Sequence, residues 1–204
     1  VEALESVHLI GVSGSWALAN NEFSHRVTLA ICIEFHFITI LSKIDNTSFY
    51  RTSNNLLAYY GKVESGEFDT RSLLRKILEN KRLFLPKSAK REIKLDIYQI
   101  ENLDADLEKG LYDIMEPIPS KSQKVSISLM DLVIVPGSVF DESGGRYGFG
   151  AGYYDSLLEN YNGIKVALAL DFTVMKFKLK LQPHDIKMDY IITEKKIYDC
   201  ENFN

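Results

Sequence analysis

The chain has 204 residues, of which 46% are hydrophobic and 25% charged, so it has the composition of an ordinary globular domain. This composition excludes a disordered, collagen-like or coiled-coil chain. The formal net charge of −4 disfavours nucleic acid as the main partner, because proteins that bind a phosphate backbone are usually basic. Cys32 and Cys200 are far apart and have no metal-ligand spacing, so we expect reduced thiols in a cytoplasmic protein.

The N-terminal residues 1–24 contain glutamates but no lysine or arginine, which is unlike a signal or transit peptide. They show no hydrophobic periodicity, so we predict a loose N-terminal arm over 1–24 and a single α/β domain over 25–204. The most apolar run, residues 27–41, is shorter than the roughly 20 residues that a membrane-spanning helix needs. It is therefore predicted to be a buried core segment, and no membrane partner is expected.

The first half of the chain contains four predicted elements. They are a core element, a strand, a helix and a second strand, over residues 25–44, 55–60, 71–80 and 82–85 respectively. The core element has the apolar spacing of a helix, although its β-branched residues weakly favour a strand. Asp69 and Thr70 offer an N-cap to the helix that follows them. The order strand, helix, strand predicts two parallel strands joined by a right-handed crossover.

The second half returns to α/β order after an interruption. Residues 92–100 alternate between apolar and polar side chains, which predicts a half-exposed, antiparallel strand. Residues 101–123 are polar and turn-rich, and they are predicted to make an excursion over the sheet. Strands are then predicted over 131–135, 165–170 and 190–193, with a helix over 153–161. Together these elements predict an α/β three-layer sandwich, in which a mostly parallel sheet carries helices on both faces.

A glycine-rich segment lies between the strand at 131–135 and the helix at 153–161. Five of the nine residues 144–152 are glycine. Loops at the carboxyl edge of a parallel sheet bind ligands, and glycine backbones next to a helix N-terminus suit a phosphate group. Arg146 adds a permanent, forked cation that fits phosphate oxygens. The spacing matches neither the dinucleotide fingerprint nor the P-loop, and a merely flexible loop is the alternative interpretation.

Three acidic residues and one histidine are further candidates for chemistry. Asp155 falls in the first turn of the predicted helix, where it either serves the helix dipole or binds Mg²⁺ beside a phosphate. Asp185 precedes the last strand and is expected near the same sheet edge, where neighbouring His184 is either a base or an inert surface group. Glu67 follows the first strand, and it is either a solvated acid or an acceptor for a heterocycle with N–H donors.

The segment from Pro136 to Asp155 resembles the signature of the 5-formyltetrahydrofolate cyclo-ligase family, whose members are also called 5,10-methenyltetrahydrofolate synthetases. The matching positions are Pro136, Gly137, Phe140, Asp141, Gly144, Arg146, Gly148, Gly150, Gly152, Tyr153, Tyr154 and Asp155, while Tyr147 replaces the usual leucine. Weaker similarity in the stretches YYGKVESGEFDT, IMEP and HDIKMDYIIT extends the resemblance over residues 40–200.

The resemblance implies an ATP- and Mg²⁺-dependent ligase of folate one-carbon metabolism. Its substrate would be 5-formyltetrahydrofolate, with or without a polyglutamate tail, and its products 5,10-methenyltetrahydrofolate, ADP and phosphate. Phosphoryl transfer relies on positioning and on neutralised charge, which the glycine-rich segment is suited to supply. The resemblance further implies a monomer whose fold is similar to that of sugar-phosphate isomerases and CoA transferases.

The resemblance also implies roles for individual residues. The nucleotide site would consist of Arg146, Tyr147, Gly148, Phe149, Gly150, Ala151, Gly152, Tyr153 and Tyr154. The folate substrate would contact Tyr60, Glu67, Phe149, Gly150, Ala151, Gly152 and Tyr153, with Glu67 on the pterin ring. Asp155 and Asp185 would bind Mg²⁺, and Arg146 and Asp155 would be the catalytic residues.

One feature of the family has no match in residues 1–24. Family members begin with a basic helix of the form K-x-x-x-R that reaches the ATP phosphates, whereas this stretch has neither lysine nor arginine. The departure supports a second hypothesis, a non-catalytic folate-binding paralogue. Without the resemblance, a third hypothesis is a sugar-phosphate-type isomerase that uses the glycine-rich segment to bind an anion.

Overall fold

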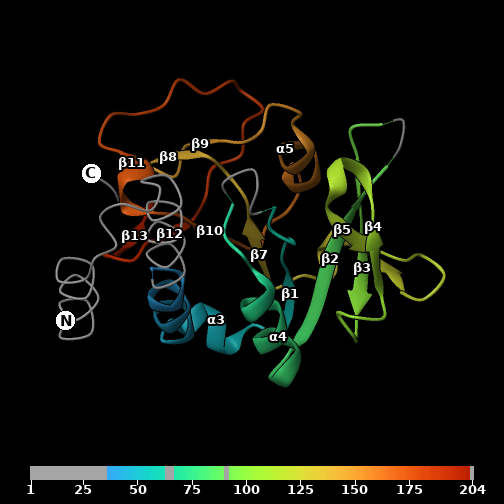
Figure 1. Cartoon of the computed structure of the whole chain (residues 1–204). Coiled ribbons are helices and arrows are strands. Elements are labelled where there is room, and N and C mark those ends of the chain that lie inside the picture. Colours follow the sequence, from blue (N-terminus) through green and yellow to red (C-terminus); the bar gives the residue numbers. More distant parts are fainter. Residues whose placement is uncertain (1–35, 63–66, 90–91, 203–204) are drawn as a thin grey trace, which may run out of the picture. The chain divides into compact units, whose positions relative to one another are not determined.

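A computed structural model describes residues 36–62, 67–89 and 92–202 (Figure 1). The predicted arm over 1–24, Cys32 and the first part of the core element at 25–44 lie outside these residues. Residues 36–45 are helical, and the buried side chains Phe37, Ile40, Leu41 and Ile44 follow the spacing of one helix face. The helix prediction is thus confirmed for the described part of the core element. Among the described residues, no helix combines the length and apolarity that crossing a membrane requires.

An eight-stranded sheet forms the centre of the described chain, in the order β13-β12-β10-β7-β1-β2-β3-β6 (Figure 1). In that order the strands are Ile197–Asp199, Tyr190–Ile192, Ile164–Leu168, Leu132–Val135, Asn55–Leu57, Arg82–Ser88, Leu95–Ile100 and Lys124–Val125. The five strands from β12 to β2 run parallel, while β13, β3 and β6 are antiparallel to their neighbours. The predictions of a mostly parallel sheet, of a parallel pair β1–β2 and of an antiparallel strand at 92–100 are confirmed.

Two smaller sheets and several short helices complete the described chain. One sheet joins β11 (Val174–Met175), β8 (Val139–Asp141) and β9 (Arg146–Tyr147), and the other joins β4 (Leu107–Lys109) and β5 (Met115–Pro117). The helices are α3 (Ser48–Thr52), α4 (Arg71–Asn80) and α5 (Tyr153–Leu158), with 3-10 turns at Leu111–Asp113, Ile127–Leu129 and Asp171–Thr173. The predicted excursion over 101–123 therefore contains a hairpin, β4–β5, that its sequence pattern did not indicate.

The apolar patterns explain why the central elements form. Every residue of β1 and β7 is buried, as expected of parallel strands covered on both faces. Helix α4 has the predicted bounds and buries Leu73, Leu74 and Ile77 on one face. Strand β2 was predicted to end at Leu85, before Pro86, but it continues to Ser88. Strand β1 pairs with β2 only as far as Phe84, so Pro86 lies beyond the ladder on that side, while on the other side it is in register with Ile97 of β3.

Two further details differ from the predictions. Thr70 is the N-cap residue of α4, but its side chain makes no capping hydrogen bond. Its hydroxyl instead donates to the Tyr59 carbonyl at 2.8 Å and accepts from the Gly61 backbone N–H at 2.9 Å, which pins the chain after β1 to the start of α4. Helix α5 ends at Leu158, three residues earlier than predicted, and leaves the buried Tyr161 in the following turn.

Candidate active site

A cavity of about 700 Å³ lies where β1, β2 and β7 end, at the carboxyl edge of the parallel strands. Its lining comes from the segment after β1 (Tyr59, Tyr60, Lys62, Glu67), the end of β2 (Leu85, Pro86, Ser88), Leu95, the β5 region (Ile114, Met115, Glu116), the segment after β7 (Pro136, Arg146 to Asp155) and His184 with Asp185. The volume is typical of a site for a small organic ligand. The place matches the rule that α/β folds bind ligands beyond the carboxyl ends of parallel strands.

All candidate residues from the sequence line this one cavity. Tyr60, Glu67, Asp185 and His184 meet the whole run from Arg146 to Asp155 there, although they come from three distant parts of the chain. Phe149 is 60% exposed at the cavity, so its ring is accessible to a ligand. The structure thus brings the predicted residues together, while the role of each one stays a prediction.

Several lining residues were missed in the sequence. Tyr59 lies beside Tyr60, Ser88 ends β2, and Glu116 lies in β5. Glu116 is only 4% exposed, and its carboxylate accepts from the Ser88 backbone N–H at 3.2 Å and pairs with Lys87 at 3.7 Å. The sequence did contain a hint, since Glu116 is a single acid between Met115 and a proline. An acid in an apolar stretch is unfavourable to bury unless it is paired or has a function.

Arg146 and Asp155 form the best-defined contact of the site. The Arg146 guanidinium donates to Asp155 Oδ1 at 2.7 Å and to the Pro136 carbonyl at 3.2 Å, and only 4% of its side chain is exposed. Asp155 Oδ1 also accepts from the Ile186 backbone N–H at 3.1 Å. Arg146 thus holds Asp155 in a fixed orientation and joins the glycine-rich segment to the segment before β12.

The glycines of the segment are required by its geometry at three positions. A Cβ at Gly148 would lie 2.7 Å from a guanidinium nitrogen of Arg146, so a larger residue would displace the arginine. Gly150 and Gly152 have φ of 88° and 68°, in the left-handed region that glycine adopts without strain. Helix α5 has six residues, so the backbone of the loop, rather than a long helix dipole, is the main polar feature presented to a ligand.

A second group of polar side chains lies on the cavity wall. Burial raises the pKa of Glu67, and the hydrogen bond that its Oε2 accepts from the Lys62 backbone N–H only partly offsets this effect. Burial likewise raises the pKa of Tyr59 and of Tyr154, so both hydroxyls remain protonated at neutral pH. The Tyr154 hydroxyl and the Nε of Arg146 are buried without a hydrogen-bond partner among the described residues. Such atoms are candidates to bind a ligand, because buried polar groups are rarely left unpaired.

The two predicted metal ligands both lie on the cavity. Asp185 Oδ2 accepts from the Gln182 backbone N–H at 2.6 Å, and its Oδ1 lies 3.9 Å from Nε2 of the mostly exposed His184. Within residues 36–62, 67–89 and 92–202, no group of three or more His, Cys, Asp or Glu side chains is placed to hold a metal ion. Two carboxylates fit Mg²⁺, which commonly binds one or two protein carboxylates together with substrate phosphates.

Comparison with known proteins identifies the family to which the chain belongs. The model of the 5-formyltetrahydrofolate cyclo-ligase family matches residues 38–194, which include every predicted site residue. The chain belongs to the 5-formyltetrahydrofolate cyclo-ligase family. The segments around Glu67, Arg146 and Asp185 are therefore parts of one cyclo-ligase domain, as the resemblance in their sequence implied.

Individual cyclo-ligases show how far the similarity extends. The probable 5-formyltetrahydrofolate cyclo-ligase of Schizosaccharomyces pombe is 27% identical over 81% of this chain and 87% of its own length. The mitochondrial cyclo-ligase of Arabidopsis thaliana is 26% identical, and the match spans 71% of this chain but only 60% of the plant protein. The solved structure of Aquifex aeolicus 5,10-methenyltetrahydrofolate synthetase is 31% identical, with a TM-score of 0.70 over 81% of each chain. These relatives establish the mixed α/β fold.

Proposed function

We propose that the protein closes the ring of 5-formyltetrahydrofolate to 5,10-methenyltetrahydrofolate, using ATP and releasing ADP and phosphate. The observation that carries the proposal is the convergence of three separate family segments, around Glu67, Arg146 to Asp155 and Asp185, on one cavity. The cavity has an exposed aromatic ring, buried donors without a hydrogen-bond partner among the described residues and several carboxylates. This combination suits a heterocycle next to a phosphorylated group.

The reaction has two steps, of which the first phosphorylates the formyl oxygen and the second closes the ring at the formyl carbon. The formyl oxygen attacks the γ-phosphorus of ATP, and the bond from that phosphorus to the β-bridging oxygen breaks to release ADP. The N10 nitrogen then attacks the activated formyl carbon and loses its proton, and the carbon–oxygen bond breaks to release phosphate. The product carries the carbon between N5 and N10 as an amidinium. The protein's contribution is to position these groups and to stabilise charge.

The residues of the glycine-rich segment would serve the phosphate end of the reaction. Backbone N–H groups from Tyr147 to Gly152 would approach the nucleotide phosphates, which the absence of Cβ atoms at the glycines permits. Arg146 would add positive potential and keep Asp155 oriented. Asp155 and Asp185 would hold Mg²⁺, which supplies charge neutralisation on the transferred phosphoryl group.

The segment after β1 and part of the glycine-rich segment would bind the folate. Glu67 would accept hydrogen bonds from the pterin N–H groups, and Tyr60, Phe149 and Tyr153 would pack against its rings. The three-layer arrangement, the likeness to sugar-phosphate isomerases and CoA transferases, the monomeric state and the cytoplasmic location belong to the same proposal. The three-layer arrangement follows from the order of the predicted elements, the likeness and the monomeric state from the resemblance, and the cytoplasmic location from the two distant cysteines.

One assay tests the proposal against its alternatives. The purified full chain is mixed with 5-formyltetrahydrofolate, with and without Mg-ATP, and the near-ultraviolet absorbance of the methenyl product is followed. We expect product only with Mg-ATP, and a rate about 100-fold lower in Asp155→Asn, the usual cost of removing one preorganised charged group. Asp104→Asn, whose side chain is 88% exposed, is the matched control and should react like the wild type.

Two outcomes would contradict the proposal. Folate binding by calorimetry without any product would favour the non-catalytic paralogue, which the lack of basic residues in 1–24 supports. If the protein binds no folate and forms no methenyl product but isomerises a sugar phosphate, the isomerase hypothesis is favoured.

A further inference from the structure

A cluster of lysines lies outside the set of predicted site residues. Residues 176–187, between β11 and β12, carry four exposed lysines, Lys176, Lys178, Lys180 and Lys187, against one aspartate. None of the four forms an ion pair with another described residue. We call residues 176–187 the lysine segment. In a chain of net charge −4 this is a local surplus of positive charge.

The lysine segment is fixed beside the glycine-rich segment by three hydrogen bonds. The Leu179 backbone N–H donates to Asp141 Oδ2 at 2.7 Å, the Tyr147 hydroxyl donates to the Lys180 carbonyl at 3.1 Å, and the Ile186 N–H donates to Asp155. In Figure 1 this orange-to-red stretch runs along the same side as β8 and β9. Two of the anchors, Tyr147 and Asp155, line the cavity, so the backbone of the lysine segment is held at its rim, while the four lysines themselves lie outside the lining.

The cavity itself is short of positive charge. Its lining contains four acidic side chains, Glu67, Glu116, Asp155 and Asp185, against three basic ones, Lys62, Arg146 and the exposed His184. Arg146 is already paired with Asp155. A bound triphosphate adds several negative charges, and its affinity depends on nearby cations.

We propose that Lys178, Lys180 and Lys187 are specificity-determining residues that attract and bind the phosphate groups of the nucleotide at the cavity rim. This inference rests on the proposed function for the identity of the ligand. The anchors favour phosphates over an acidic tail on the folate, because Tyr147 belongs to the predicted nucleotide site and Asp155 is a predicted Mg²⁺ ligand, whereas neither is among the predicted folate contacts. Lysine serves here as a mobile point charge, which tolerates a flexible polyphosphate.

The test compares two double variants of the full chain. Lys178→Gln with Lys180→Gln removes two charges from the lysine segment. Lys121→Gln with Lys124→Gln removes two exposed charges from the turn before β6 and from β6, at the other edge of the sheet. Calorimetry measures the affinities for Mg-ATP and for monoglutamyl 5-formyltetrahydrofolate at two salt concentrations.

We expect the first double variant to bind Mg-ATP about three- to tenfold more weakly, with a shallower salt dependence and unchanged folate affinity. The control should bind both ligands like the wild type. Unchanged Mg-ATP affinity, a loss of folate affinity alone, or an equal loss in the control would overturn the inference, as would a wild type that does not bind Mg-ATP. Turnover separates the two proposals: lysine-dependent Mg-ATP binding without methenyl product contradicts only the proposed function.

Discussion

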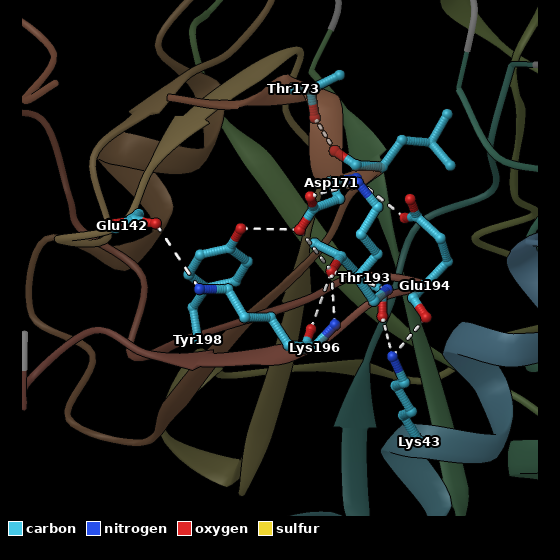
Figure 2. A network of polar contacts seen from close by, with 10 residues as sticks. Lys43, Glu142, Asp171, Thr173, Thr193, Glu194, Lys196 and Tyr198 are labelled. Carbon is cyan, nitrogen blue, oxygen red and sulfur yellow. Dashed lines mark hydrogen bonds and ion pairs between the residues drawn. The ribbon is translucent and has the colours of Figure 1, made fainter. Parts of the chain in front are cut away.

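Two aspartate-centred polar clusters of this protein differ in how completely they are hydrogen-bonded. At the cavity, Asp155 is held by Arg146 and by one backbone N–H. Beyond the end of β10, Asp171 accepts from Tyr198 at 2.8 Å, from Lys195 at 3.0 Å and from Thr193 at 3.3 Å (Figure 2). Asp155 lies in the first turn of α5, and Asp171 lies in the 3-10 turn after β10.

Figure 2 shows the Asp171 carboxylate within a network of hydrogen bonds from neighbouring side chains. Lys43, from the helix over 36–45, donates to the carbonyls of Thr193 and Glu194, and the Asp171 backbone N–H donates to Glu194. These bonds join the helix over 36–45, the turn after β10 and the β12–β13 hairpin. A closed network of this kind stabilises the arrangement of elements and leaves little for a ligand to bind.

The cluster at the cavity is left incomplete. The Arg146 Nε and the Tyr154 hydroxyl have no partner among the described residues, although both atoms are buried. An unpaired buried donor costs free energy until something binds it. The comparison predicts that the unpaired groups at the cavity are available to a ligand, whereas those of the Asp171 cluster are already used within the protein.

The largest expected effect comes from breaking the one strong contact of the cavity cluster. Arg146→Ala should lower the free energy of unfolding by about 3 kcal/mol, because it removes a buried arginine and leaves the partly buried Asp155 without its cation. Urea unfolding measures the change, and Arg146→Lys should recover part of it by keeping the charge. Arg71→Ala breaks an exposed pair with Asp69 and should cost under about 1 kcal/mol. Equal effects of the two alanine variants would show that burial does not strengthen the Arg146 pair.

A pair of tyrosine variants tests the difference between the two clusters directly. Tyr198→Phe removes the hydrogen bond to Asp171 and should cost about 1 kcal/mol of stability with no change in ligand affinity. Tyr154→Phe removes an unpaired hydroxyl, so stability should stay the same or rise slightly, while affinity for substrate or Mg-ATP should fall. Urea unfolding and calorimetry on both variants test this. A clear loss of stability in Tyr154→Phe would mean that its hydroxyl already has a partner.

The smallest expected effect concerns how the free energy of unfolding changes at acidic pH. Burial alone would raise the pKa of Asp171, but the hydrogen bonds from Lys195 and Tyr198 outweigh it and leave the pKa below its usual value. The unfolded chain therefore takes up the proton first as pH falls. The stabilisation is complete above the unfolded pKa of about 3.9 and is lost as pH drops through the folded pKa. Between pH 5 and 3, urea unfolding should show a weaker pH dependence in Asp171→Asn than in the wild type. Identical slopes would contradict the assignment.

Several parts of the fold and site were predictable because their causes are local. The bounds of α4 follow from apolar residues at helix spacing, and β7 follows from a continuous apolar run closed by Pro136 and Gly137. The glycine-rich loop and the acids at 67, 155 and 185 were recognisable from residue type and from their place after strands. The N-cap hydrogen bond predicted at Thr70 is absent, because the Thr70 hydroxyl donates to the carbonyl of Tyr59, eleven residues away, and the local sequence does not indicate this contact.

The sequence alone was enough to indicate the family, the mostly parallel sheet and the glycine-rich segment that lines the cavity, since periodicity and glycine spacing act within short windows. Only the tertiary structure decided which groups meet. It paired Arg146 with Asp155, buried Glu116 on the cavity wall and tied the lysine segment to the rim through Tyr147. It also closed the network around Asp171, whose partners lie more than twenty residues away. These contacts depend on which strands become neighbours in the sheet, and no local pattern specifies that order.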